Sequence, residues 1–226
     1  MQPKDTYTPG GAIDGLVAGF RVFRARYYGQ SPERMYELST YGQSPTVMII
    51  ACSDSRVDPA LLLGAGPGDL FTVRNVANLV PPYTPDSNYH GTSAALEFAV
   101  RDLEVRDIVV LGHSTCGGIQ ALRDAVAGAP AEREFIVPWM DIAAEACCCP
   151  DGQSVPDQQS VEHDGIRISL KNLRSFPWVD ERVREGDLML RGWWVDLASG
   201  RLCEIGPDGG TMDLVPAREE TLRATN

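Results

Sequence analysis

The sequence has no long apolar run, no excess of positive charge and no regular pattern of paired cysteines. No segment reaches the ~18 consecutive apolar residues that indicate a membrane-spanning helix. Acidic side chains outnumber basic ones by 31 to 20, and no basic cluster reverses this locally, which argues against nucleic acid and anionic membranes as partners. The amino-terminal stretch lacks the basic start and apolar core of a secretory signal, so we expect a cytoplasmic protein.

The six cysteines also argue against a disulfide-stabilised protein. Cys147, Cys148 and Cys149 are adjacent, which is a poor basis for disulfide pairing, and a chain of 226 residues does not need such crosslinks. Cysteines in a reducing compartment favour metal binding or redox chemistry. Three consecutive cysteines on a helix point about 100° apart and cannot all face one metal, so we assign this run no role.

What the sequence does contain is an alternation of apolar strands with amphipathic helices. Strands are predicted at 46–51, 70–73 and 106–113 and as a hairpin over 187–205, and helices at 13–38, 91–103, 116–128, 134–147 and 159–174. This order predicts an α/β fold with a mostly parallel central β-sheet flanked by helices, in a single domain spanning 1–226. Residues 1–11 are expected to form a loose arm, and 12–38 a helical arm interrupted at Pro32.

Metal-binding side chains follow two of the predicted strands. Cys52, Asp54 and Arg56 come directly after the first strand, and His113 and Cys116 end the third strand and begin the next helix. Ligands collect at the carboxyl ends of strands in parallel sheets, so these residues are expected to converge. Two thiolates and one imidazole suit zinc and leave a fourth tetrahedral position open. Zinc in such a site lowers the pKa of bound water and produces hydroxide near neutral pH.

Asp54 and Arg56 have two possible arrangements at such a site. Asp54 can accept a hydrogen bond from the zinc-bound hydroxide, while Arg56 holds the carboxylate ionised through a bidentate pair. Alternatively, Asp54 binds zinc itself as a fourth ligand and closes the site.

Three motifs together resemble the β-class carbonic anhydrases: "CSDSRVDP", "VRNVANLVPP" and "GHSTCGG". The resemblance covers residues 12–128 strongly and continues more loosely through 168–202. It implies one Zn²⁺ per chain held by Cys52, His113 and Cys116, with Asp54 and Arg56 as the catalytic pair. The reaction it implies is the reversible hydration of carbon dioxide to bicarbonate and a proton, through zinc-bound hydroxide.

The same resemblance implies a substrate pocket and an assembly. Gln43 matches a glutamine that hydrogen-bonds the substrate, Phe71 and Val76 match apolar pocket residues, and Phe98 stands where some relatives have tyrosine. In the family these groups converge across a subunit boundary, so a homodimer or a multiple of dimers is implied, with the arm over 12–38 packed on the partner. The alternative for the three apolar residues is core packing, and for Gln43 a plain loop position.

Ile49 and Ala51 indicate the subtype. Members that close the site with aspartate and bind bicarbonate beside it carry tryptophan and glycine at these two positions. The chain therefore resembles the open, non-allosteric subtype of the plant-type enzymes. Two alternative functions remain: hydrolysis of small substrates such as carbon disulfide on the same site, and a catalytically silent zinc-binding protein. The residue that exports the proton is also open, with His90 and direct transfer to buffer as the candidates.

Overall fold

The computed structural model describes residues 11–130, 132–148 and 155–217, which form two compact units, one up to Ser44 and one from Pro45 onwards. The first unit contains helix α1 (Gly11–Arg24), a π-helical segment (Ala25–Gln30) and helix α2 (Pro32–Tyr41). The interruption predicted at Pro32 is confirmed, because proline at a first helical position needs no hydrogen-bond donor. Of the loose arm predicted for 1–11, residues 1–10 lie outside the described residues and Gly11 already belongs to α1.

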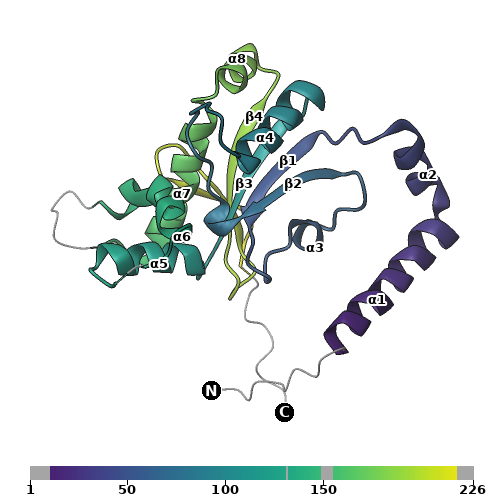
Figure 1. Ribbon diagram of the computed structural model, residues 1–226, viewed down its shortest axis with the longest axis horizontal. Helices are drawn as coiled ribbons and strands as arrows, with labels where there is room; N and C mark the ends of the chain where they lie inside the picture. The colour runs from purple at the N-terminus through teal and green to yellow at the C-terminus, as the bar shows by residue number, and fades with distance from the viewer. Residues whose placement is uncertain (1–10, 131, 149–154, 218–226) are drawn as a thin grey trace. The chain divides into compact units, whose positions relative to one another are not determined.

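The second unit is built on a six-stranded sheet in the order β2-β1-β3-β4-β5-β6 (Figure 1). The strands are β1 (Val47–Cys52), β2 (Leu70–Asn75), β3 (Asp107–His113), β4 (Met189–Val195), β5 (Leu202–Ile205) and β6 (Thr211–Val215). The first four are parallel, whereas β5 and β6 pair antiparallel to their neighbours. The predicted, mostly parallel sheet is therefore confirmed. The edge strand β6 was not predicted.

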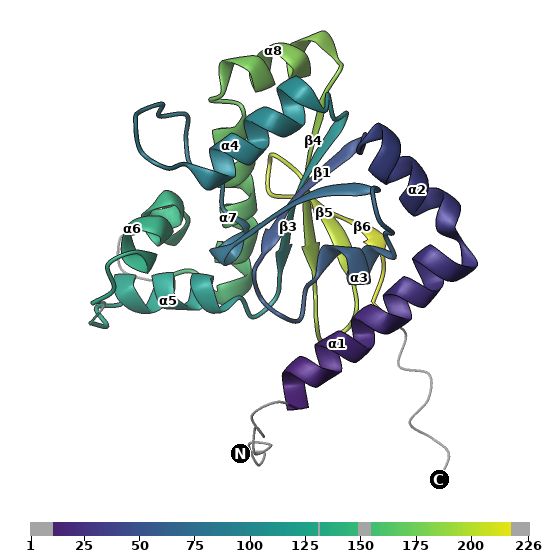
Figure 2. The same ribbon diagram turned by 45° about the vertical axis from the view of Figure 1, so that its right-hand side comes forward.

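Helices cover the sheet on both faces. The helices of the second unit are α3 (Pro59–Leu63), α4 (Gly91–Glu97), α5 (Gly117–Val126), α6 (Ile136–Met140), α7 (Gln158–Leu173) and α8 (Pro177–Glu185). Figures 1 and 2 place α4, α7 and α8 together on one side of the sheet and α3 on the other. Along β1, Met48 and Ile50 join the core under α4, α7 and α8, while Ile49 and Ala51 belong to the core of the opposite face. This strict alternation follows from the two-residue period of a strand.

Two predicted helices are less regular than their sequence periodicity suggests. The helix predicted at 91–103 is α4 followed by a π-helical turn (Phe98–Asp102), and that at 134–147 is α6 followed by a 3₁₀ segment (Asp141–Cys147). Among the described residues, none of the helices is both long and apolar enough to cross a membrane.

Glycines on the two central strands bring α7 close to the sheet. A Cβ atom on Gly112 of β3 would lie 2.7 Å from Cδ1 of Ile166, and one on Gly192 of β4 would lie 2.6 Å from Cγ2 of the same side chain. Ile166 is fully buried and belongs to the main core. Only glycine allows this helix to pack at that distance. The contact also fixes the end of β3, where His113 lies.

Candidate metal centre

Three buried ligands converge where the parallel strands end. Cys52 is the last residue of β1, His113 is the last residue of β3, and Cys116 immediately precedes α5. Their donor atoms all lie within 4.8 Å of one another, and the two sulfurs are 4.0 Å apart. Tetrahedral zinc with Zn–S bonds of about 2.3 Å holds two sulfurs roughly 3.8 Å apart. The spacing therefore fits two thiolates on one zinc ion.

The orientation of His113 also fits a metal ligand. Its Nδ1–H donates to the backbone carbonyl of Ser114 at 2.9 Å, which leaves the lone pair on Nε2. Within the described part of the chain, Nε2 is buried and has no hydrogen-bond partner. A buried polar nitrogen without a partner is costly, and a metal ion bound at Nε2 would satisfy it. This nitrogen faces the two sulfurs.

The electrostatics of the three ligands suit a cation as well. Hydrogen bonding with the Cys116 thiol lowers the pKa of Cys52, and the same bond raises the pKa of Cys116. One negative charge is thus shared between the two sulfurs before any metal binds. Burial is the largest single influence on the pKa of His113 and lowers it, but the nearby Cys52 sulfur, the Ser114 carbonyl and the Asp54 carboxylate together raise this pKa by more, so the net shift is upward. A divalent ion would displace the protons that the cluster holds.

Asp54 and Arg56 form a bidentate ion pair beside the ligands. The Arg56 guanidinium donates to Asp54 Oδ1 at 2.9 Å and to Oδ2 at 2.7 Å, and it also donates to the side chain and carbonyl of Thr115. These hydrogen bonds hold the pKa of Asp54 far below its ordinary value. Asp54 Oδ2 lies 4.0 Å from His113 Nε2, close enough to contact a group bound at the metal. Ligation of the metal by Asp54 would have to compete with its pairing to Arg56.

Arg74 is a supporting residue that the sequence did not suggest. From β2 its guanidinium donates to the carbonyls of Cys52 and Asp54 and to the carboxylate of Asp58. Asp58 in turn caps α3 by accepting from the backbone N–H groups of Ala60 and Leu61. One side chain therefore fixes the whole loop between β1 and α3. The available signal was a charged residue near the end of an otherwise uncharged strand, "LFTVRN".

Glu162 is a second unpredicted residue, and it supports Cys116. Its carboxylate accepts from the backbone N–H of Cys116 at 2.9 Å, from Gln158 Nε2 at 2.8 Å and from Trp194 Nε1 at 3.1 Å. Gln158 also donates to the Cys116 carbonyl. Glu162 is only 4% exposed, and a buried carboxylate without hydrogen-bond partners is costly. The three donors supply the hydrogen bonds that water would otherwise provide. Nothing in the local sequence separates it from the solvent-facing acidic residues of a helix.

The predicted substrate-pocket residues fall in different places. Val76 directly follows β2, beside the Cys52–Asn75 pair of the sheet. Phe71 and Phe98 contact each other, with ring centroids 5.8 Å apart. Phe71 pairs with Met48, four residues before Cys52, which is roughly 13 Å along the strand. Within one chain this aromatic pair therefore lies away from the ligands.

Gln43 belongs to the amino-terminal unit, whereas the metal ligands belong to the second unit. Its side chain is exposed.

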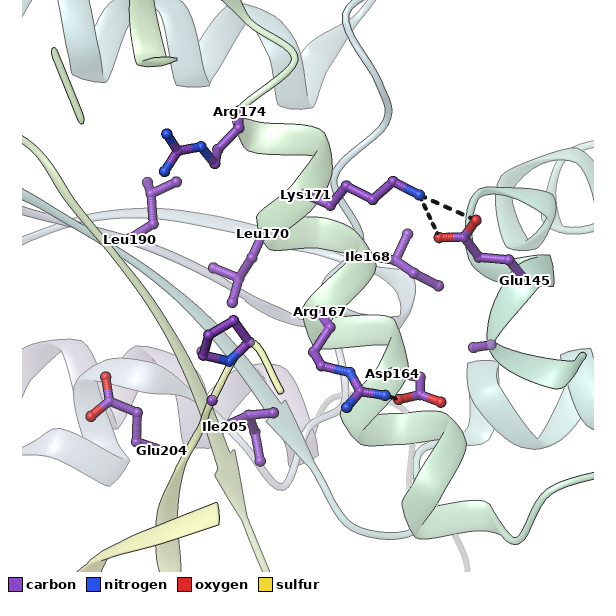
Figure 3. A pocket seen from close by; sticks show the side chains of 14 residues that line it. Glu145, Asp164, Arg167, Ile168, Leu170, Lys171, Arg174, Leu190, Glu204 and Ile205 are labelled. Atoms are coloured by element: carbon purple, nitrogen blue, oxygen red, sulfur yellow. Dashed lines mark hydrogen bonds and ion pairs between the residues drawn. The ribbon is translucent and has the colours of Figure 1, made fainter. Parts of the chain in front are cut away.

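A separate cleft of about 690 Å³ between α7 and the strands β4 and β5 contains charged side chains but no ligand cluster (Figure 3). Its three cations are already paired: Lys171 with Glu145, Arg167 with Asp164 and Arg174 with Asp180. Among the described residues, the group Cys52, His113 and Cys116 is the one set of three potential metal ligands that converges.

Comparison with known proteins identifies the family. The family model described as carbonic anhydrase matches residues 47–202. Beta carbonic anhydrase 5, chloroplastic, of Arabidopsis thaliana is 39% identical, over 84% of this chain and 67% of that protein. Beta carbonic anhydrase 3 of the same organism is 36% identical, over 84% of this chain and 75% of that protein.

Solved structures agree with the sequence comparison. The beta-carbonic anhydrase CcaA superposes with a TM-score of 0.80 at 29% identity, covering 93% of this chain and 94% of that one. A tetrameric beta-carbonic anhydrase from Sordaria macrospora gives a TM-score of 0.74 at 26% identity, covering 89% and 98%. The fold and the sequence resemblance are thereby confirmed, and the chain belongs to the β-class carbonic anhydrases.

Proposed function

We propose that this protein catalyses the reversible hydration of carbon dioxide to bicarbonate and a proton, with one zinc ion per chain bound by Cys52, His113 and Cys116. The observation that carries the proposal is the buried Nε2 of His113, which has no hydrogen-bond partner among the described residues and lies beside two sulfurs that share a negative charge. Membership of the β-class family supports the same reaction.

The chain's own residues have distinct roles in this reaction. When bound, zinc supplies a nucleophile near neutral pH by lowering the pKa of a coordinated water molecule. Asp54 accepts a hydrogen bond beside the metal and so orients the nucleophile toward the substrate. Arg56 keeps Asp54 ionised and fixed, and Thr115 fixes Arg56 in turn. Because two thiolates neutralise the charge of Zn²⁺, we expect activity to increase on the alkaline side of neutrality.

We assign the open, plant-type subtype to this site. Asp54 is engaged by both terminal and inner nitrogens of Arg56, which disfavours its use as a fourth ligand. Ile49 and Ala51, which occupy the tryptophan and glycine positions of the closed subtype, are both buried in the sheet. The fourth position is therefore proposed to take solvent or substrate.

A homodimer, or a multiple of dimers, is proposed to complete the substrate pocket. Val76 supplies one wall from the same chain, and Gln43, Phe71 and Phe98 are proposed to come from the partner. The support is that α1 contains no buried residue although it carries large apolar side chains, with Leu16 70% and Phe20 59% exposed. Exposed apolar residues on one helix indicate a surface that another chain covers. A site that holds zinc through the thiolates of Cys52 and Cys116 needs both cysteines reduced, so we propose the cytoplasm as the compartment.

Stopped-flow measurement of carbon dioxide hydration tests the proposal, with the zinc content determined on the same sample. We expect about one zinc per chain and a hydration rate that disappears on chelation and returns with added zinc. Stoichiometric zinc without hydration between pH 6.5 and 9 would contradict the proposal. Hydrolysis of carbon disulfide by such a sample would then identify the hydrolase, and its absence the silent zinc-binding protein.

A further inference from the structure

Hydration releases a proton, and the chain has only three histidines that can carry it near neutral pH. His113 is committed to the metal centre. His163 packs edge-on against Trp194, its Nε2 is buried, and burial lowers its pKa. His90 is the remaining imidazole, and its side chain is 35% exposed.

His90 lines a cleft of about 720 Å³ together with Asn75 and Val76. Asn75 is the direct neighbour of Cys52 in the β1–β2 ladder, so this part of the cleft wall adjoins a strand that ends in a metal ligand. Thr92 and Trp139 of α6 also line the cleft. A cleft of this size accommodates several water molecules.

A hydrogen bond joins two residues of the cleft wall. Asn75 Nδ2 donates to Thr92 Oγ1 at 3.3 Å, and Thr92 lies two residues after His90 in the first turn of α4. The His90 side chain is not used to cap that helix. Its ring lines the cleft and contacts Asp86 instead.

The contact of His90 with Asp86 prepares the imidazole to accept a proton. His90 Nε2 lies 2.7 Å from Asp86 Oδ1, and this bond lowers the pKa of Asp86 to about 2. The carboxylate is thus ionised and accepts Nε2–H, which leaves Nδ1 as the acceptor nitrogen. The other ionisable side chains along the cleft are Tyr89 and Glu134.

We propose that His90 is a catalytic residue that takes the proton of the hydration reaction at Nδ1 and passes it to a buffer base, while Asp86 stabilises the imidazolium. This inference rests on the proposed function. The proton leaves the metal centre through water in the cleft, His90 gains it, and the buffer base then removes it. No electron transfer or further reactant is involved.

Exchange of ¹⁸O between carbon dioxide and water at chemical equilibrium tests this proposal on the zinc-loaded, full-length protein. The method gives two rates: interconversion of carbon dioxide and bicarbonate, which needs no net proton export, and release of labelled water, which needs a proton delivered to the site. In weak buffer, His90→Ala should lower the ratio of water release to interconversion on the order of tenfold. Asp86→Asn should lower it less, and added imidazole should restore the ratio in His90→Ala. Glu134→Gln, which lines the same cleft, is the matched control and should keep the wild-type ratio.

Two results would overturn the role of His90. An unchanged ratio in His90→Ala would show that protons leave by another route, and an equal loss of both rates would indicate a structural role. A zinc-loaded wild-type protein that interconverts no carbon dioxide would instead refute the proposed function itself. The wild-type interconversion rate therefore separates the two failures.

Discussion

Replacing Arg74 with methionine tests whether the loop that carries Cys52 and Asp54 is held by one guanidinium. Methionine keeps much of the apolar stem of arginine but removes all three hydrogen bonds to Cys52, Asp54 and Asp58. Two backbone carbonyls and one carboxylate then lose a charged donor. The Arg74 side chain is 29% exposed, so water replaces part of what is lost.

The size of the effect follows from these contacts. Hydrogen bonds to charged groups contribute roughly 1.5–3 kcal/mol each, but bonds made by one side chain are not additive and solvent reaches this one. We therefore expect Arg74→Met to lower the free energy of unfolding by about 2–4 kcal/mol. If about 2 kcal/mol of this is the cost of ordering the loop for zinc, zinc affinity falls about 30-fold.

Urea unfolding of the zinc-free protein and competition with a chelating dye measure the two effects separately. Arg101→Met is the control, because Arg101 makes one exposed ion pair with Glu97 and its loss should change stability by less than about 0.5 kcal/mol. If Arg74→Met matches Arg101→Met in both assays, Arg74 does not hold the loop and this part of the account is wrong.

Two further substitutions test the packing of α7 and the Asp54–Arg56 pair. Gly112→Ala should lower the free energy of unfolding, measured in urea, by about 1–3 kcal/mol, because the new methyl group meets Ile166, which also lies against Gly192. Gly91→Ala is the control, because Gly91 has open space around it. An equal effect of the two substitutions would show that the packing of α7 on Gly112 does not matter for stability. Arg56→Gln should raise the depressed pKa of Asp54 toward about 3.9. The Asp54–Arg56 pair contributes its full stability above the ordinary pKa of Asp54, and this contribution is lost as pH falls through the lower pKa of the folded state. The difference in unfolding free energy between wild type and Arg56→Gln should therefore be constant between pH 5 and 9 and shrink below pH 4. A difference that instead varies between pH 6 and 9 would show that another group titrates with the pair.

The ligand set could be predicted from the sequence because each ligand directly follows a recognisable element. Apolar runs indicated β1 and β3, and the carboxyl ends of neighbouring parallel strands lie at one edge of a sheet. Cys52 and His113 were therefore expected to lie close together, and Cys116 comes only three residues after His113. The bidentate pairing of Asp54 with Arg56 was likewise local, since only one residue separates them.

The supporting residues could not be predicted, because their contacts depend on strand register and helix placement. Arg74 reaches the loop from β2 only because Asn75 pairs with Cys52. Glu162 contacts Cys116 across 46 positions, and only the close packing of α7 on the sheet brings it there. The edge strand β6 was missed because each of its residues is exposed, which removes the alternation that indicates a strand.

The separation of Phe71 from the ligands also depends on three-dimensional placement. A resemblance assigns Phe71 and Phe98 to a substrate pocket, but it does not say which chain's pocket they line. Phe71 lies at the opposite end of β2 from Asn75, and Phe98 contacts Phe71, which is the reason that we propose the partner's site for both.

X-ray absorption at the zinc edge tests the central claim most directly, because it reports the atoms that bind the metal. We expect two sulfurs at about 2.3 Å from zinc and two lighter atoms, one of them an imidazole nitrogen, at about 2.0–2.1 Å. In Cys116→Ser one sulfur should disappear from this shell. A shell made only of nitrogen and oxygen, or one of four sulfurs, would contradict a metal centre formed by Cys52, His113 and Cys116.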